Sequence, residues 1–287
     1  MACALLGACA STAPNGRSQL VAPSPVSSVY SSIDMNFQLA TTPDIAVACS
    51  GAQCKIDQGF DRQVKRLGTR LAEAAYASHP GLKERIPAFN FVVADKSELG
   101  TASDTNGTIV IYRAVRTPGL SESVLAFLLA REMGRVIARH HEEKSAVRII
   151  ASAVVAVLLP VTNLAGAAAF LAGSAASTAG ANVIAPDGDP AKTREASTIA
   201  MDLLAKQGWR PTEVSRALSA YAGTLDDNDW KRSIQDSLVV FAPADTQHSL
   251  LALDHSQAVE VRQSTDDNIK TRRSIKAPRR VPRKETP

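Results

Sequence analysis

The sequence is poor in cysteine and in aromatic residues. It has four cysteines among 287 residues, and Phe, Trp and Tyr together make up 5%. Four cysteines are too few for a disulfide-dense scaffold. Hydrophobic residues reach 45% and charged residues 21%, which excludes a collagen-like or a wholly disordered chain. The length predicts one domain of about 150 to 200 residues with appended segments, with two domains as the alternative.

The body of the chain has no excess of positive charge. The tail at 270–287 has a net charge of +7. The whole chain has a formal net charge of +4, so the remainder has a net charge of −3. A protein that coats nucleic acid would place its basic residues on a folded face, so no nucleic-acid partner is expected. We expect a disordered tail, either solvated or in contact with anionic lipid head groups.

No lysine or arginine precedes the short apolar run at the N-terminus. The run nevertheless ends in Leu6-Gly7-Ala8-Cys9, which resembles a bacterial lipobox. The resemblance implies a signal remnant at 1–9 and lipidation of Cys9. It places the protein on the periplasmic side of a bacterial cell envelope, as a membrane-anchored lipoprotein. An ordinary N-terminal segment is the alternative.

A long unbroken apolar stretch is also missing. Residues 149–186 contain no charged residue, but Pro160 and Asn163 interrupt the apolar stretch. A spanning helix needs about 20 consecutive apolar residues. We therefore predict a buried or membrane-grazing helical hairpin at 149–185 rather than a true transmembrane helix.

Residues 10–57 are rich in Ser, Ala, Pro and Thr and show little periodicity, which indicates a linker or a weakly ordered arm. Cys49 and Cys54 lie near its end. They could close a small loop through a disulfide in an oxidising compartment, and would be free thiols in the cytosol.

The periodicity of apolar residues predicts an α+β domain, mainly helical, at 58–225. A C-terminal extension at 226–269 and the basic tail follow it. Helices are expected where apolar residues recur every three or four positions, and strands where β-branched residues cluster between turn signals. The predicted helices are 60–76, 124–141, 192–207, 211–221 and 230–241, and the predicted strands are 89–94 and 108–112.

The helix at 125–141 and its surroundings resemble the HtpX-like and CAAX-prenyl-endopeptidase family of zinc metallopeptidases. The helix contains Arg131-Glu132-Met133-Gly134-Arg135 at the position of an H-E-x-x-H motif. The later segments Thr193-Arg-Glu-Ala-Ser197 and Gln207-Gly-Trp-Arg-Pro211 resemble the family's second metal-binding segment and the turn after it. The similarity spans about residues 58–222. It implies a zincin-like metallopeptidase fold with a small sheet beside the active-site helix.

This chain departs from the family at each metal ligand. H-E-x-x-H works because two neutral imidazoles at i and i+4 lend lone pairs to Zn²⁺ while the glutamate activates water. Arg131 and Arg135 occupy the imidazole positions, and a guanidinium has no lone pair to donate. Thr193 replaces the third ligand and Ser197 replaces a second-segment aspartate. Glu132, the general-base position, is retained, so we expect an inactive site without metal or cofactor.

Two hypotheses describe what the arginines do instead. In the first, Arg131 and Arg135 hold Glu132, and possibly Glu195, in a buried ion-pair cluster. In the second, both arginines face solvent in an open groove. An active site would instead have to draw a zinc ligand from Glu195, from His255, or from His140 with Glu143 at i, i+3.

The resemblance leads to three functional hypotheses. The first is an inactive relative of periplasmic zinc metalloendopeptidases that binds polypeptide chains or envelope proteins, with the strand at 108–112 as an edge for peptide pairing. The second is an active zinc metalloendopeptidase with a non-standard site. The third is a membrane-organising lipoprotein that inserts the apolar hairpin at 149–185.

Overall fold

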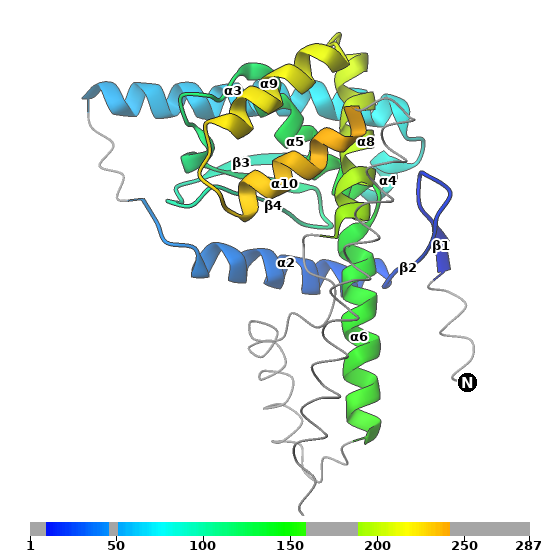
Figure 1. The fold of residues 1–287 in the computed structure, drawn as a ribbon. Helices are drawn as coiled ribbons and strands as arrows, with labels where there is room; N and C mark the ends of the chain where they lie inside the picture. The colour runs from blue at the N-terminus through cyan, green and yellow to red at the C-terminus, as the bar shows by residue number, and fades with distance from the viewer. Residues whose placement is uncertain (1–9, 46–50, 159–188, 242–287) are drawn as a thin grey trace, which may run out of the picture. The chain divides into compact units, whose positions relative to one another are not determined.

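A buried helix, α5, lies at the centre of the fold in the computed structural model (Figure 1). The structure describes residues 10–45, 51–158 and 189–241, all within one unit, Met1–Phe241. The α+β, mainly helical class is confirmed. Its elements are β1 (Ala10–Thr12), β2 (Ser18–Leu20), α2 (Ser24–Thr41), α3 (Gly51–Ser78), α4 (Leu82–Arg85), β3 (Asn90–Ala94), β4 (Thr101–Ser103), β5 (Thr108–Tyr112), η1 (Arg113–Val115), α5 (Glu122–Ile137), α6 (His140–Leu158), α8 (Pro190–Lys206), α9 (Pro211–Gly223), α10 (Asp229–Leu238) and η2 (Val239–Phe241).

Helix α5 is buried along nearly its whole length because its sequence is apolar on almost every face. Its N-terminus is capped by Ser121, whose hydroxyl accepts a hydrogen bond from the amide of Val124. Helix α3 packs against it and against β3, while α8 crosses it at Gly134. A Cβ atom at Gly134 would lie 2.4 Å from the carbonyl oxygen of Ala196, so the two backbones meet directly there.

The three-stranded sheet has the order β3-β5-β4. Strand β5 pairs in parallel with β3 and antiparallel with β4, and is therefore the middle strand. The prediction that 108–112 is an edge strand is wrong. Its run of buried apolar residues, Ile109 to Tyr112, matches a central strand covered on both faces. The open edge beside α5 belongs to β4, which is too short and too polar to show a strand pattern in the sequence.

The expectation of a linker or weakly ordered arm at 10–57 is corrected by the structure. This stretch forms the hairpin β1–β2, the 18-residue helix α2 and the start of α3. Helix α2 contacts the domain through polar and apolar residues: Asp34 pairs with Lys144 and Arg148 of α6, at 2.8 and 2.9 Å, while Met35 and Leu39 pack against the core. An inward face that mixes serine and aspartate with apolar residues does not produce the apolar periodicity by which a surface helix is recognised.

The predicted helix at 124–141 is interrupted. Helix α5 ends at Ile137, and Arg139 adopts a left-handed conformation with φ of 64°. Arg85 donates to the last carbonyl oxygens of α5, on Val136 and Ile137, and so satisfies the helix end. Helix α6 then starts at His140 in a new direction.

The C-terminal helices agree with their predicted positions. Helix α10 packs against α8 and α9, so residues 226–241 are part of the same unit rather than an extension of it. The predicted hairpin at 149–185 is described only as far as the end of α6. No helix in the described ranges is both long and apolar enough to cross a membrane. Cys54 is disulfide-bonded, whereas Cys9, Cys49, His255 and the basic tail lie outside the described residues.

Candidate functional site

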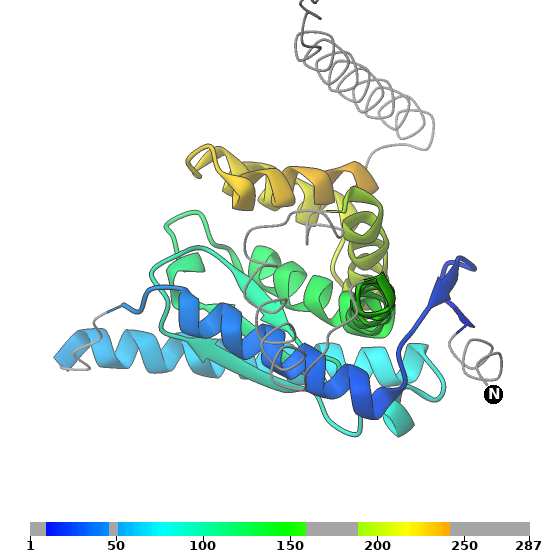
Figure 2. The ribbon, with the colours of Figure 1, turned by 90° about the horizontal axis from the view of Figure 1, so that it is seen from below.

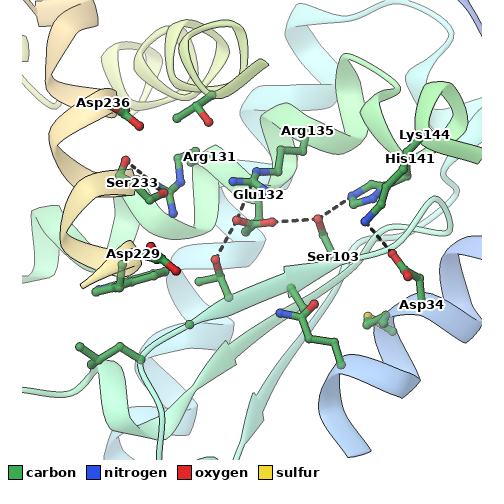
Figure 3. A pocket seen from close by; sticks show the side chains of 18 of the residues that line it. Asp34, Ser103, Arg131, Glu132, Arg135, His141, Lys144, Asp229, Ser233 and Asp236 are labelled. Carbon is green, nitrogen blue, oxygen red and sulfur yellow. Dashed lines mark hydrogen bonds and ion pairs between the residues drawn. The ribbon is translucent and has the colours of Figure 1, made fainter. Parts of the chain in front are cut away.

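A pocket of about 980 Å³ opens between β4, α5, α10 and the inner side of α2 (Figure 3). Helix α8 adds Thr193 to its wall, and α6 adds His141 and Lys144. The volume lies at the upper end of the range for ligand pockets. The charged side chains that line it are four carboxylates and four permanent cations: Asp34, Glu132, Asp229, Asp236, Arg131, Arg135, Lys144 and Arg232.

Glu132 is buried in the pocket wall, and each of its carboxylate oxygens accepts a hydrogen bond. Thr101 Oγ1 donates to Oε1 at 2.8 Å and Ser103 Oγ donates to Oε2 at 2.9 Å (Figure 3). Nε of Arg135 lies 3.6 Å from Oε1. Burial acts to raise the pKa of Glu132, but Arg135, Arg131 and the two hydroxyls outweigh it and hold the pKa below its usual value. An ionised, fully occupied carboxylate is poorly suited to take a proton from water.

Ser103 also contacts His141, whose Nε2 lies 2.8 Å from Ser103 Oγ. The serine hydroxyl has one proton, and the ionised Glu132 can only accept. The Ser103 proton therefore points to Glu132, and His141 must donate from Nε2 to Ser103. In this arrangement His141 cannot accept the serine proton, which a serine nucleophile would require of its base.

Arg131 turns away from Glu132 toward α10. Its Nη1 donates to the carbonyl oxygen and hydroxyl of Ser233 and to the hydroxyl of Ser237, at 3.1 to 3.2 Å. Its guanidinium also lies 5.6 Å from the ring centre of Trp230. The side chain is fully buried, and burial together with Arg135 lowers the pKa of Arg131 to about 10. Arg131 thus fastens α10 to α5.

The ion-pair hypothesis is correct for one arginine and wrong for the other. Arg135 pairs with Glu132, whereas Arg131 bonds to serine oxygens. Neither arginine pairs with Glu195. The competing hypothesis of two solvent-facing arginines also fails, since Arg131 is 1% exposed.

Glu195 lies in a second cluster, on the other side of α8. Its Oε2 accepts from His140 Nε2 at 3.0 Å and from Arg17 Nη2 at 3.2 Å. Arg17 also pairs with Glu143 at 2.9 Å, so the β1–β2 hairpin is fastened to α6 and α8. Burial acts to raise the pKa of Glu195, but His140 and Arg17 outweigh it and lower the pKa. His140 and Glu143 therefore serve this cluster and do not face the pocket.

The remaining family positions, Thr193 and Ser197, are buried on α8. Thr193 reaches the pocket, while Ser197 does not line it. The Oγ of Ser197 and the Nε of Arg131 are both buried without a hydrogen-bond partner among the described residues. A hydroxyl and two guanidinium groups do not fit a zinc ion, and no group of three or more His, Cys, Asp or Glu in the described ranges has metal-binding geometry.

Four residues of the site are not predicted by the sequence: Thr101, Ser103, His141 and Ser237. Thr101 and Ser103 share a face because they are two apart on a strand, but a three-residue polar strand is too short to be predicted from the sequence. No local sequence pattern indicates Ser237, because its partner Arg131 lies 106 positions earlier in the chain.

Comparison with models of known protein families finds no family that matches the chain. A search of curated proteins finds no match either. The geometry of the site and the resemblance in its motifs therefore carry the functional assignment.

Proposed function

We propose that this protein is a non-catalytic relative of the HtpX-like zinc metalloendopeptidases, with a zincin-like fold, and that it binds an extended polypeptide segment in the pocket. The observation that carries the proposal is the open edge of β4 on the pocket. No strand among the described residues pairs with that edge.

The backbone register shows which groups of β4 are available. Gly100 and Asp104 exchange hydrogen bonds with β5 residues, so Ala102 between them faces β5 as well. Thr101 and Ser103 therefore direct their backbone N–H and C=O groups away from β5. An extended peptide can pair with these groups and place alternate side chains in the pocket.

Glu132 supports binding rather than hydrolysis. It holds the side chains of Thr101 and Ser103 and so keeps β4 against α5. The equal numbers of cationic and anionic side chains in the wall favour a chain of low net charge over a polyanion. Met35, Leu99 and Trp230 add apolar surface for the bound side chains.

The test is fluorescence anisotropy with labelled peptides from unfolded casein. Gln235→Trp, at the exposed rim of the pocket, should weaken binding at least about five-fold because the indole obstructs it. Ser219→Trp on the exposed side of α9 is the matched control and should bind as the parent does.

The same samples test catalysis. We expect no cleavage of casein with added zinc, and no stoichiometric metal by mass spectrometry. Cleavage that disappears in Glu132→Gln would overturn the non-catalytic assignment. Equal binding by the parent and Gln235→Trp would place the peptide site elsewhere.

A further inference from the structure

We propose that the outer face of α2, together with the projecting end of α6, docks on the surface of a lipid bilayer. This inference is independent of the peptide-binding proposal, because it concerns the side of α2 that faces away from the pocket. It rests on how α2 distributes its side chains.

Helix α2 packs two apolar side chains, Met35 and Leu39, against the core, but exposes more large apolar side chains than an ordinary surface helix does. It buries Ser27 and Ser31 against the domain. On its outer side it exposes five large apolar side chains: Val26, Val29, Tyr30, Ile33 and Phe37. Ile33 and Val29 are 59% and 58% exposed, and Phe37 is 51% exposed. A helix in water normally keeps most of its large apolar side chains on the buried side, so this face indicates an apolar environment outside the protein.

Helix α6 projects from the same side of the domain. Figure 1 shows α6 continuing past α2, and Figure 2, seen from below, shows α6 end-on beside α2. The last ten residues of α6, Ile149–Leu158, contain no charged residue. Ten helical residues extend roughly 15 Å, about half of the ~30 Å hydrocarbon core of a bilayer. A helix that lies flat beside one that points outward fits insertion into a single leaflet.

No charged side chain interrupts the apolar face of α2. Lys144 and Arg148 precede the uncharged end of α6 by a few residues. Both pair with Asp34 and so fix the two helices to each other. Tyr30 has the amphipathic ring favoured at the head-group level of a bilayer.

A second copy of the chain fits this face less well. An 18-residue helix is about 27 Å long, and at about 10 Å wide it offers roughly 300 Å². A stable protein interface buries about 800 Å² per partner. A flat partner would also meet the projecting end of α6. A bilayer needs no minimum contact area of this kind, and it can take up the projecting end of α6. We therefore assign the face to a lipid surface.

The test is co-sedimentation of the full chain carrying Cys9→Ser with equimolar phosphatidylglycerol and phosphatidylethanolamine vesicles. Cys9→Ser removes any lipid anchor, and every variant keeps the same basic tail, so differences between variants report on the surface that each substitution changes. Ile33→Asp and Phe37→Asp should each lower the partition coefficient at least about ten-fold, because each replaces an inserted apolar side chain with a charge. Ile56→Asp is the matched control: Ile56 is 53% exposed on α3, and its replacement should leave partitioning unchanged.

Ile33→Gln and Phe37→Gln give a milder series, and thermal unfolding shows whether each variant is folded. Partitioning by the parent that falls in both α2 series and persists in Ile56→Asp supports the proposal. No partitioning by the parent, or equal loss in all variants, overturns it. Light scattering that shows a dimer dispersed by Ile33→Asp would assign the face to a second copy and also overturn it.

Discussion

Ser103 Oγ lies 2.9 Å from Oε2 of Glu132, and this contact joins the edge of the sheet to the central helix. It connects two elements that would otherwise form separate walls of the pocket. It also decides the direction of the serine proton and, with it, what the site is able to do.

Glu132→Gln should lower the free energy of unfolding at neutral pH by about 2 to 3 kcal/mol, because it breaks a buried pair with Arg135. The folded pKa of Glu132 lies below its ordinary value of 4.5, so the ionised carboxylate stabilises the fold above that pH. That contribution is lost as the pH falls through the folded pKa. Urea unfolding from pH 7 to pH 3 should therefore show the parent and the variant converging. A difference that does not change with pH would mean that Glu132 is protonated in the fold.

Ser103 should not react with a fluorophosphonate probe. Its proton is committed to Glu132, and His141 donates to it, so the hydroxyl has no base. Intact-mass spectrometry after incubation with the probe is the measurement, with trypsin as a positive control. A covalent adduct on Ser103 that is lost in His141→Gln would mean that His141 accepts the serine proton instead of donating to the hydroxyl.

Zinc binding should appear when zinc ligands are introduced at the three positions that the family resemblance assigns to the metal. Arg131, Arg135 and Thr193 all line the same pocket. In a zincin-like fold, Arg131→His, Arg135→His and Thr193→Glu together supply two imidazoles and a carboxylate, and we expect about one zinc ion per chain. The measurement is metal content after dialysis.

The double variant without Thr193→Glu is the control and should hold zinc more weakly. A folded triple variant without zinc would argue against the zincin-like arrangement of α5 and α8.

Gly134→Ala should destabilise the protein by about 1 to 3 kcal/mol, since the new methyl group would press against the backbone of Ala196. Gly59→Ala is the matched control. Gly59 lies in α3 with nothing within 4 Å of an added Cβ, so alanine should be neutral or stabilise the helix by up to about 1 kcal/mol. Thermal and urea unfolding of both variants measure the difference. Similar effects at the two positions would contradict a close crossing of α5 and α8.

The sequence alone determined the helices whose apolar faces are buried and the chemistry of the metal-ligand positions. Apolar residues at helical spacing locate α3, α8 and α9 because burial demands that spacing in any context. The guanidinium groups of Arg131 and Arg135 have no lone pair wherever they point. The resemblance to the zinc peptidases likewise comes from local motifs, and the zincin-like arrangement remains a prediction.

Only the tertiary structure decided where those groups point and which strand is the edge. Arg131 turns to Ser233 and Ser237 because α10, about 100 residues later, brings oxygen acceptors to a buried cation. Strand β4 becomes the edge because β5 pairs on its other side with β3. Helix α2 exposes its apolar residues because α6 supplies cations for Asp34 on the inner side. Each outcome depends on a partner distant in the chain, and local sequence patterns carry no information about such partners.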